Sequence, residues 1–69
     1  MMNELDNNIA KFRARQGLSQ QDLAEAIGVS RKTISTVETG RFTPSVVIAL
    51  KIAQHFDVPV EKLFSLEEI

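Results

Sequence analysis

Two adjacent basic residues, Arg31 and Lys32, follow a serine at the expected start of a helix. Gly28 is typical of the end of the preceding helix, and Ser30 is typical of a residue that caps the next one. Because a helix N-terminus carries the positive end of the helix dipole, each cation there costs about 0.3 to 1 kcal/mol instead of stabilising the fold. The two cations indicate a purpose other than folding, and a polyanionic ligand would reverse the sign of the penalty.

The basic residues are concentrated in the middle of the chain, although the formal net charge is −1. Residues 11–41 contain six basic and three acidic side chains, whereas the rest of the chain contains two basic and six acidic ones. A charge asymmetry of this kind attracts a polyanion to one part of a molecule and repels it from the other. The total charge argues weakly against a nucleic-acid ligand, but the distribution favours one.

The composition, with 43% hydrophobic and 25% charged residues, predicts a single domain over residues 1–69 with a core of about 5–66. The chain has no cysteine and one histidine, His55. The sequence therefore predicts no disulfide, no metal site and no cofactor. The longest apolar run, VVIAL, is far shorter than the ~20 residues of a membrane helix. Acidic residues stand where a signal peptide would be basic, so we expect a cytoplasmic protein without a membrane segment.

The spacing of apolar residues predicts five helices and no strand. The predicted helices cover about residues 5–16, 20–27, 31–39, 46–56 and 59–64, and Ser19, Ser30 and Ser45 are candidate caps for three of them. The predicted core residues are Leu5, Ile9, Phe12, Leu23, Ala24, Ile27, Ile34, Val37, Val46, Ala49, Leu50, Ala53, Phe56 and Leu63.

The second and third predicted helices are about eight residues each and are joined by the short turn IGVS. Two short helices joined in this way cross steeply, as in a helix-turn-helix unit. Ala24 is small enough to let the helices approach, and Gly28 can take the positive φ that the turn requires. The spacing therefore predicts a helix-turn-helix unit formed by these two helices.

The segment LSQQDLAEAIGVSRKTISTVETGRFTPS, followed by ALKIAQHFDVPVEKLF, resembles the Cro/repressor-type (XRE) helix-turn-helix family over about residues 5–66. The resemblance implies an all-α, five-helix, lambda-repressor-like domain that binds double-stranded DNA. Phage repressors and Cro place the second helix of the unit in the major groove, with its N-terminal residues on base edges. In this sequence that recognition helix would be residues 31–38.

The resemblance places base-reading positions on Arg31, Lys32 and Thr36. Arg31 can offer two parallel donors to guanine, Lys32 one donor to a base or phosphate, and Thr36 a short side chain to a thymine methyl group or the DNA backbone. The alternative for all three is an ordinary solvated helix face. The residues implied as DNA-backbone contacts are Gln20, Ser30, Thr33, Ser35, Gly40 and Arg41.

The family also suggests a structural pair between Arg13 on the first helix and Glu38 at the end of the third. From the sequence alone, the two residues have opposite charges and plausible proximity. The alternative is two independently solvated side chains.

Two hydrophobic stripes on the fourth helix raise the question of a second subunit. Ile48 and Ile52 form a stripe beside the expected core stripe, and a helix that is apolar on two sides needs two partners. The C-terminal tail, residues 64–69, contains further apolar residues. We expect a two-fold symmetric homodimer whose contacts are Ile48, Ile52, Phe64, Leu66 and Ile69.

The sequence is compatible with two functions, and neither of them is enzymatic. The first is a sequence-specific transcriptional regulator, a dimeric repressor on a pseudo-palindromic operator. The second is an antitoxin-like or adaptor protein that uses the same fold mainly to bind a partner protein. Neither paired inward carboxylates nor a Cys/His pair nor a phosphate-binding glycine loop is present, so the sequence does not predict an enzyme. Phe42, in the loop before the fourth helix, is expected to pack on the domain, with an exposed contact as its alternative.

Overall fold

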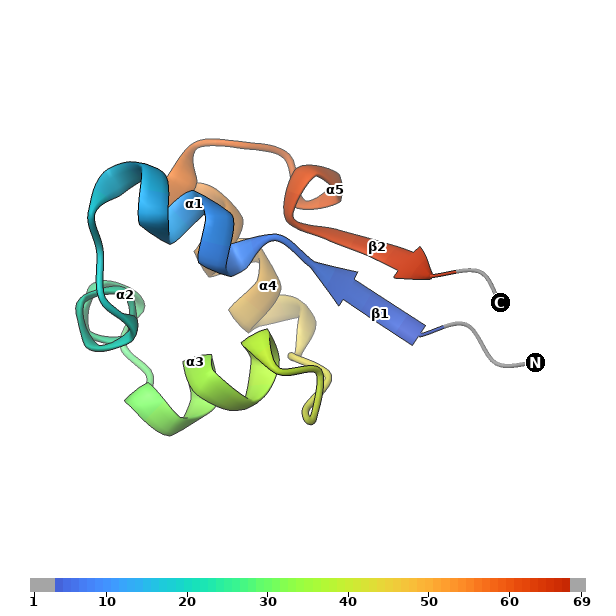
Figure 1. Cartoon of the computed structure of the whole chain (residues 1–69), viewed down its shortest axis with the longest axis horizontal. Coiled ribbons are helices and arrows are strands. Elements are labelled where there is room, and N and C mark those ends of the chain that lie inside the picture. Colours follow the sequence, from blue (N-terminus) through green and yellow to red (C-terminus); the bar gives the residue numbers. More distant parts are fainter. Residues whose placement is uncertain (1–3, 68–69) are drawn as a thin grey trace.

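The computed structural model describes residues 4–67, which form five helices flanked by two short strands (Figure 1). The elements are β1 (Glu4–Asn7), α1 (Ile9–Gln16), α2 (Gln20–Ile27), α3 (Arg31–Glu38), α4 (Val46–Phe56), α5 (Val60–Leu63) and β2 (Phe64–Glu67). The two strands belong to opposite ends of the chain and lie together on one side of the helices. The fold is therefore mostly helical, with helices close to those that the sequence predicts. In the described part of the chain, no helix combines the length and apolar character needed to cross a membrane.

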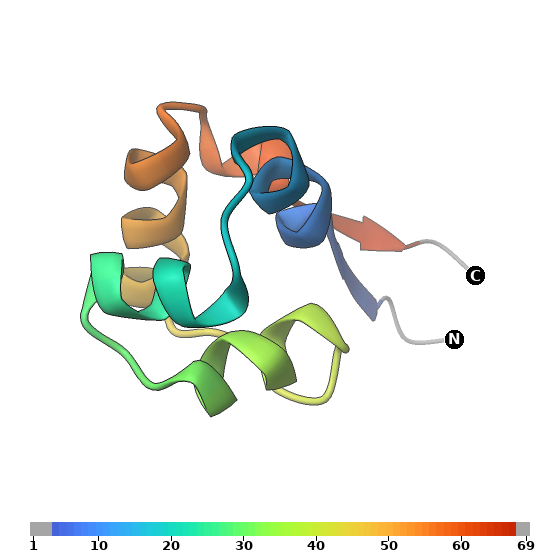
Figure 2. The ribbon, with the colours of Figure 1, turned by 60° about the vertical axis from the view of Figure 1, so that its left-hand side comes forward.

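α2 and α3 pack directly against each other, and α2 also packs against α4. Figure 2, turned from the first view, shows α3 on the far side of the molecule from α1, with its outer side uncovered by other helices. Gly28 ends α2 with a φ of 78°, a backbone conformation that favours glycine. The chain can thus turn sharply within the short connection to α3.

Among the residues that the structure describes, the core consists of ten buried hydrophobic ones contributed by all five helices. Ile9, Leu23, Ile34, Ile52 and Leu63 are its largest fully buried side chains, and Ala24, Ile27, Val37, Ala53 and Phe56 complete it. The Phe12 ring packs against the Phe56 ring, with ring centroids 5.5 Å apart. The buried residues of α2 and α3 are those that the spacing predicts, so the outward faces of both helices are determined as well.

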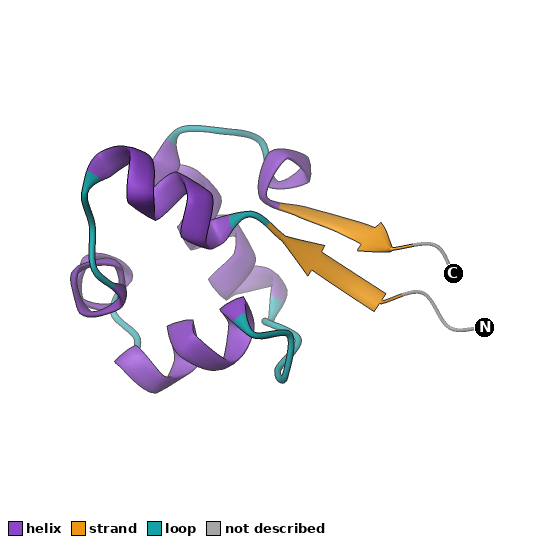
Figure 3. Ribbon diagram, viewed as in Figure 1, coloured by secondary structure: helices purple, strands orange, loops and turns teal. Residues whose placement is uncertain are grey.

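The strands correct the prediction of an all-α chain whose first helix begins at Leu5. β1 and β2 pair antiparallel, with Leu5 opposite Leu66 and Asn7 opposite Phe64 (Figure 3). The Asn7 side chain accepts a hydrogen bond at 3.1 Å from the backbone N–H of Ile9, the residue at which α1 actually begins. The strands pair across almost the whole chain, so local periodicity carries no signal for them.

The orientation of α4 also differs from the prediction. Ile52 is fully buried and Ile48 packs partly against the core, whereas Val46 is 75% exposed and Leu50 is 50% exposed. Both stripes of this helix are apolar, so helical spacing could not decide which one faces inward. The expected dimer contact through Ile52 is wrong because its side chain belongs to the core.

The other predicted dimer residues differ in exposure. Phe64 is partly buried against the core, whereas Leu66 is 64% exposed on β2. Ile69 lies outside the described residues. A dimer contact through Leu66 therefore stays a prediction.

Serine side chains cap three helices as the sequence predicts. Ser30 Oγ accepts from the Thr33 N–H at 3.1 Å, and Ser45 Oγ accepts from the Ile48 N–H at 3.1 Å. At α2 the cap is reciprocal: Ser19 Oγ accepts from the Asp22 N–H at 2.9 Å, and the Asp22 carboxylate accepts from the Ser19 N–H at 3.0 Å. These bonds fix where α2, α3 and α4 begin.

The reciprocal cap predicts a stability that depends on pH. The hydrogen bond from the Ser19 backbone lowers the pKa of Asp22 below its ordinary value of 3.8. Its stabilisation is present above that ordinary value and is lost as the pH falls through the lowered, folded-state pKa. Asp22→Ala is therefore expected to lower the melting temperature near neutral pH, by an amount that shrinks in strong acid. Thermal melts of the wild type and of Asp22→Ala between about pH 7 and about pH 2.5 measure this difference in melting temperature. A difference that does not change with pH would contradict the role given to the Asp22 carboxylate.

Candidate nucleic-acid interface

The outward face of α3 carries the residues that the sequence predicts to contact DNA. Ile34 and Val37 are buried on the inner face. Arg31 and Lys32 are exposed in the first turn, and Thr36 is half-buried one turn further along. Burial of the opposite side thus presents the polar side of this helix to solvent.

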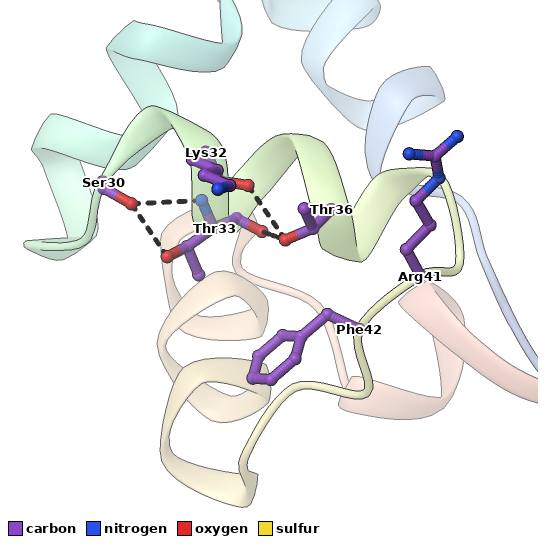
Figure 4. Close-up of a pocket in the computed structure, with 6 residues that line it drawn as sticks. All are labelled: Ser30, Lys32, Thr33, Thr36, Arg41 and Phe42. Carbon is purple, nitrogen blue, oxygen red and sulfur yellow. Dashed lines mark hydrogen bonds between the residues drawn. The ribbon is translucent and has the colours of Figure 1, made fainter.

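An open groove of about 390 Å³ runs between α3 and the loop that follows it (Figure 4). It brings together two predicted base-reading residues, three predicted backbone contacts and one aromatic ring. The lining residues are Ser30, Lys32, Thr33, Thr36, Arg41 and Phe42. Arg31 and Ser35 belong to the same helix but do not line this groove.

Internal hydrogen bonds hold the hydroxyl groups of the groove in place. The Ser30 and Thr33 hydroxyls are 2.9 Å apart and hydrogen-bonded to each other. The Thr36 hydroxyl donates back to the helix, where the carbonyl oxygens of Lys32 and Thr33 lie at 2.9 and 3.1 Å. These side chains are therefore positioned before any ligand binds.

The loop after α3 folds back onto the helix that it leaves. The backbone N–H groups of Arg41 and Phe42 both donate to the Thr36 carbonyl, at 3.0 and 3.2 Å. The Gly40 N–H donates to the Val37 carbonyl at 3.1 Å. The N–H of Gly40 itself is therefore already used, and a phosphate contact from the backbone around it stays a prediction. The Arg41 side chain remains exposed and lines the groove.

Phe42 is 49% exposed and contributes its ring to the groove (Figure 4). The sequence favoured packing of this residue on the domain, and the structure shows the exposed alternative instead. The sequence feature that could have marked Phe42 as part of the groove is an aromatic residue in a polar loop next to the predicted recognition helix. It could not decide the exposure of the ring, because that depends on how the loop folds back onto α3.

The two charges expected to pair, Arg13 and Glu38, are in direct contact. Arg13 Nε donates to Glu38 Oε2 at 2.6 Å and Arg13 Nη2 donates to Glu38 Oε1 at 3.0 Å. A third donor of Arg13 reaches the Leu18 carbonyl at 2.9 Å. The hydrogen bond to Glu38 raises the pKa of Arg13 above its ordinary value. The pair is 18% and 9% exposed, so water screens it less than a surface ion pair.

Glu38 also receives a bond from the second helix. Gln20 Nε2 donates to Glu38 Oε1 at 3.0 Å. The amide of Gln20, expected at a phosphate, is thus partly engaged inside the protein. From β1, the Asn7 side-chain amide lies 3.2 Å from the Val37 carbonyl and 3.3 Å from the Glu38 carbonyl. α1, α2 and β1 therefore all hold the C-terminal end of α3.

Arg13 and Glu38 form the one ion pair in the part of the chain that the structure describes. The groove cations Lys32 and Arg41, and Arg31 beside them, face solvent. Three exposed cations around one helix present a local positive surface on a chain of net charge −1. The arrangement suits an anionic ligand that lies along α3.

Comparison with known proteins gives the family. Residues 9–63 match the model of the helix-turn-helix family HTH_3. An uncharacterised helix-turn-helix-type transcriptional regulator of Bacillus subtilis, YgzD, is 42% identical over 64 residues, which are 93% of this chain and 97% of that protein. Another, MJ0272 of Methanocaldococcus jannaschii, has the same identity and coverage. The restriction-modification controller protein C.AhdI of Aeromonas hydrophila has a similar structure, with a TM-score of 0.73, 33% identity, and coverage of 78% of this chain and 82% of that one.

These matches define a DNA-binding helix-turn-helix domain of the kind found in transcriptional regulators. The chain belongs to the HTH_3 helix-turn-helix family, and its resemblance to XRE-type regulators is confirmed. The family is one of DNA-binding regulators and is not an enzyme class.

Loss of the carboxylate charge of Glu38 tests whether its contacts hold α3 in place. Glu38→Gln keeps the shape of the side chain but leaves Arg13 without its anion. We expect the free energy of unfolding to fall by about 1 to 3 kcal/mol, the usual effect of leaving a partly buried charged group unpaired. Urea denaturation of both proteins measures it.

Glu25→Gln is the matched control. Glu25 is exposed on α2, where it accepts one hydrogen bond from Gln21. Its substitution should change the unfolding free energy by no more than about 0.5 kcal/mol. Equal effects of the two substitutions would show that the Glu38 contacts do not stabilise the fold.

Proposed function

We propose that this protein is a sequence-specific transcriptional regulator that inserts α3 into the major groove of double-stranded DNA. In this proposal α2 and α3 form the helix-turn-helix unit, and α3 is its recognition helix. The observation that carries it is the exposed face of α3. It combines cations and fixed hydroxyl groups around one open groove, while its opposite face is buried in the core.

Base reading is assigned to three residues on the outward face of α3. The exposed Arg31 guanidinium can donate two parallel hydrogen bonds to the O6 and N7 atoms of guanine. Lys32 and Thr36 line the groove one turn apart and can contact the neighbouring base pair or its backbone. DNA also explains the two cations at the N-terminus of α3, because phosphate charge reverses the penalty that the helix dipole imposes on them.

Positioning on the DNA backbone is assigned to the residues around the reading head. Arg41 supplies a cation at the far end of the groove. Ser30, Thr33 and Ser35 supply hydroxyl oxygens along α3, and Gln20 keeps one amide hydrogen that Glu38 does not use. Contacts of this kind fix the register of a protein on DNA but carry no sequence information directly.

Repression by a homodimer on a pseudo-palindromic operator is the mode of action that we propose. The half-sites would lie about one helical turn apart, since a two-fold symmetric protein reads two-fold symmetric DNA. The resemblance to Cro and the phage repressors supports it. For the dimer surface, the structure offers the exposed stripe Val46, Val47 and Leu50 on α4 in place of the buried Ile52.

Selection of duplexes from a random pool, at about 100 mM salt, tests sequence specificity. On the duplex that it recovers, Arg31→Ala is expected to weaken binding by about 1 to 3 kcal/mol and relax the preference at one base pair. Arg41→Ala should weaken binding to all sequences alike and reduce the slope of log affinity against log salt by about one.

Arg15→Ala is the control for both variants, because Arg15 is an exposed cation on α1 whose guanidinium lies over the Phe12 ring, away from the groove. It should leave the base preference unchanged. Recovery of no consensus sequence would contradict the proposed function.

If the protein dimerises through α4, a charged substitution on this helix should lower its mass in solution. We expect sedimentation equilibrium at tens of micromolar to give a dimer. Leu50→Glu should convert it to a monomer, because it places a charge in the proposed apolar contact. Phe42→Glu, which places the same charge on an exposed hydrophobic residue outside α4, should leave the dimer intact. A monomeric wild-type protein would contradict the proposal and would favour the adaptor function, for which the α4 stripe would remain free.

A further inference from the structure

The groove beside α3 combines apolar groups with cations, which a surface made only to bind phosphate would not need. Phe42 is the one large hydrophobic side chain among its six lining residues, and about half of it faces solvent. Lys32 and Arg41 are the cations of the same groove. A ligand that satisfies both must be anionic and must also carry an exposed apolar group.

The two threonines of the groove add to its apolar character. The Thr36 hydroxyl has a single hydrogen, which it directs at the carbonyl oxygens of its own helix. The Thr33 hydroxyl is paired with the Ser30 hydroxyl. Both side chains also carry a methyl group, which takes no part in these hydrogen bonds and adds apolar surface to the groove.

The backbone that carries the Phe42 ring is tied to α3 by hydrogen bonds. The N–H of Phe42 and that of Arg41 both donate to the Thr36 carbonyl, which ties the loop to α3. The ring is not among the buried core residues or those packed against the core. It is therefore held beside α3 with exposed apolar surface that a ligand can cover.

We propose that Phe42, together with Thr33 and Thr36, forms a pocket for the C5 methyl group of thymine. This inference rests on the proposed function, since it places the groove against the major groove of DNA. Of the groups that base pairs present there, the thymine methyl is the apolar one, and the others are hydrogen-bond donors and acceptors. Lys32 and Arg41 then face the flanking phosphates. Phe42 is thus a specificity-determining residue outside the recognition helix.

Deoxyuridine provides the direct test, because it pairs as thymine does but lacks the methyl group. In the duplex preferred by the wild-type protein, each thymine is replaced by deoxyuridine in turn, and the dissociation constant is measured by fluorescence anisotropy. We expect one thymine in each half-site at which the replacement weakens binding about fourfold, the value of burying one methyl group. In Phe42→Ala the same replacement should change the dissociation constant by less than about twofold.

Two further variants make the result specific to the ring. Thr43→Ala shortens an exposed side chain of the same loop, one that does not line the groove, and should keep the full sensitivity to deoxyuridine. Phe42→Leu keeps an apolar side chain and should therefore keep part of the sensitivity to deoxyuridine. Since Phe42 is half exposed, its substitution should leave the thermal melt within a few degrees of wild type.

The outcomes separate this inference from the proposed function. A preferred duplex whose affinity does not change at any deoxyuridine position would overturn the thymine pocket and leave the regulator function standing. The same would follow if Phe42→Ala retained the wild-type sensitivity. Failure to find any preferred duplex would overturn the proposed function and the pocket together.

Discussion

The contacts of Glu38 are the constraint on which the presentation of α3 depends. This helix carries its charges at the wrong ends for its own dipole, with Arg31 and Lys32 at the N-terminus and Glu38 at the C-terminus. The bonds from Arg13 and Gln20 offset the second mismatch and connect α3 to α1 and α2. The first mismatch has no comparable partner in the described residues. The protein thus neutralises the charge at the anchored end of α3 and leaves the charge at the exposed end for a ligand.

Anchoring at one end and capping at the other give the groove its fixed geometry. Ser30 sets the start of α3, and the core residues Ile34 and Val37 set its rotation. The chain then returns, with two backbone bonds to Thr36, so that the loop forms the second wall of the groove. A reading surface gains from such preorganisation, because side chains that are already ordered lose less entropy on binding.

The sequence predicts most of this arrangement wherever the signal is local. Caps such as Ser30, the turn at Gly28 and the inward residues of α2 and α3 follow from spacing and residue type, and all of them lead directly to the outward face of α3. Prediction fails where distant parts of the chain decide. The strand pairing of Leu5 with Leu66 and the choice of Ile52 over Leu50 as the buried residue of α4 are set by tertiary packing. For the same reason the occupied N–H of Gly40 and the exposure of Phe42 could not be read from residue type.

The central claim, that the outward face of α3 and the returning loop form the DNA-binding surface, is tested most directly by NMR. Backbone amide shifts would be recorded while an unlabelled duplex is added to the isotope-labelled protein. The structure predicts the largest shifts at residues 30–36 and 41–42, with small shifts in β1, α4 and β2. Largest shifts in α4 or in the strands, with α3 unchanged, would contradict it.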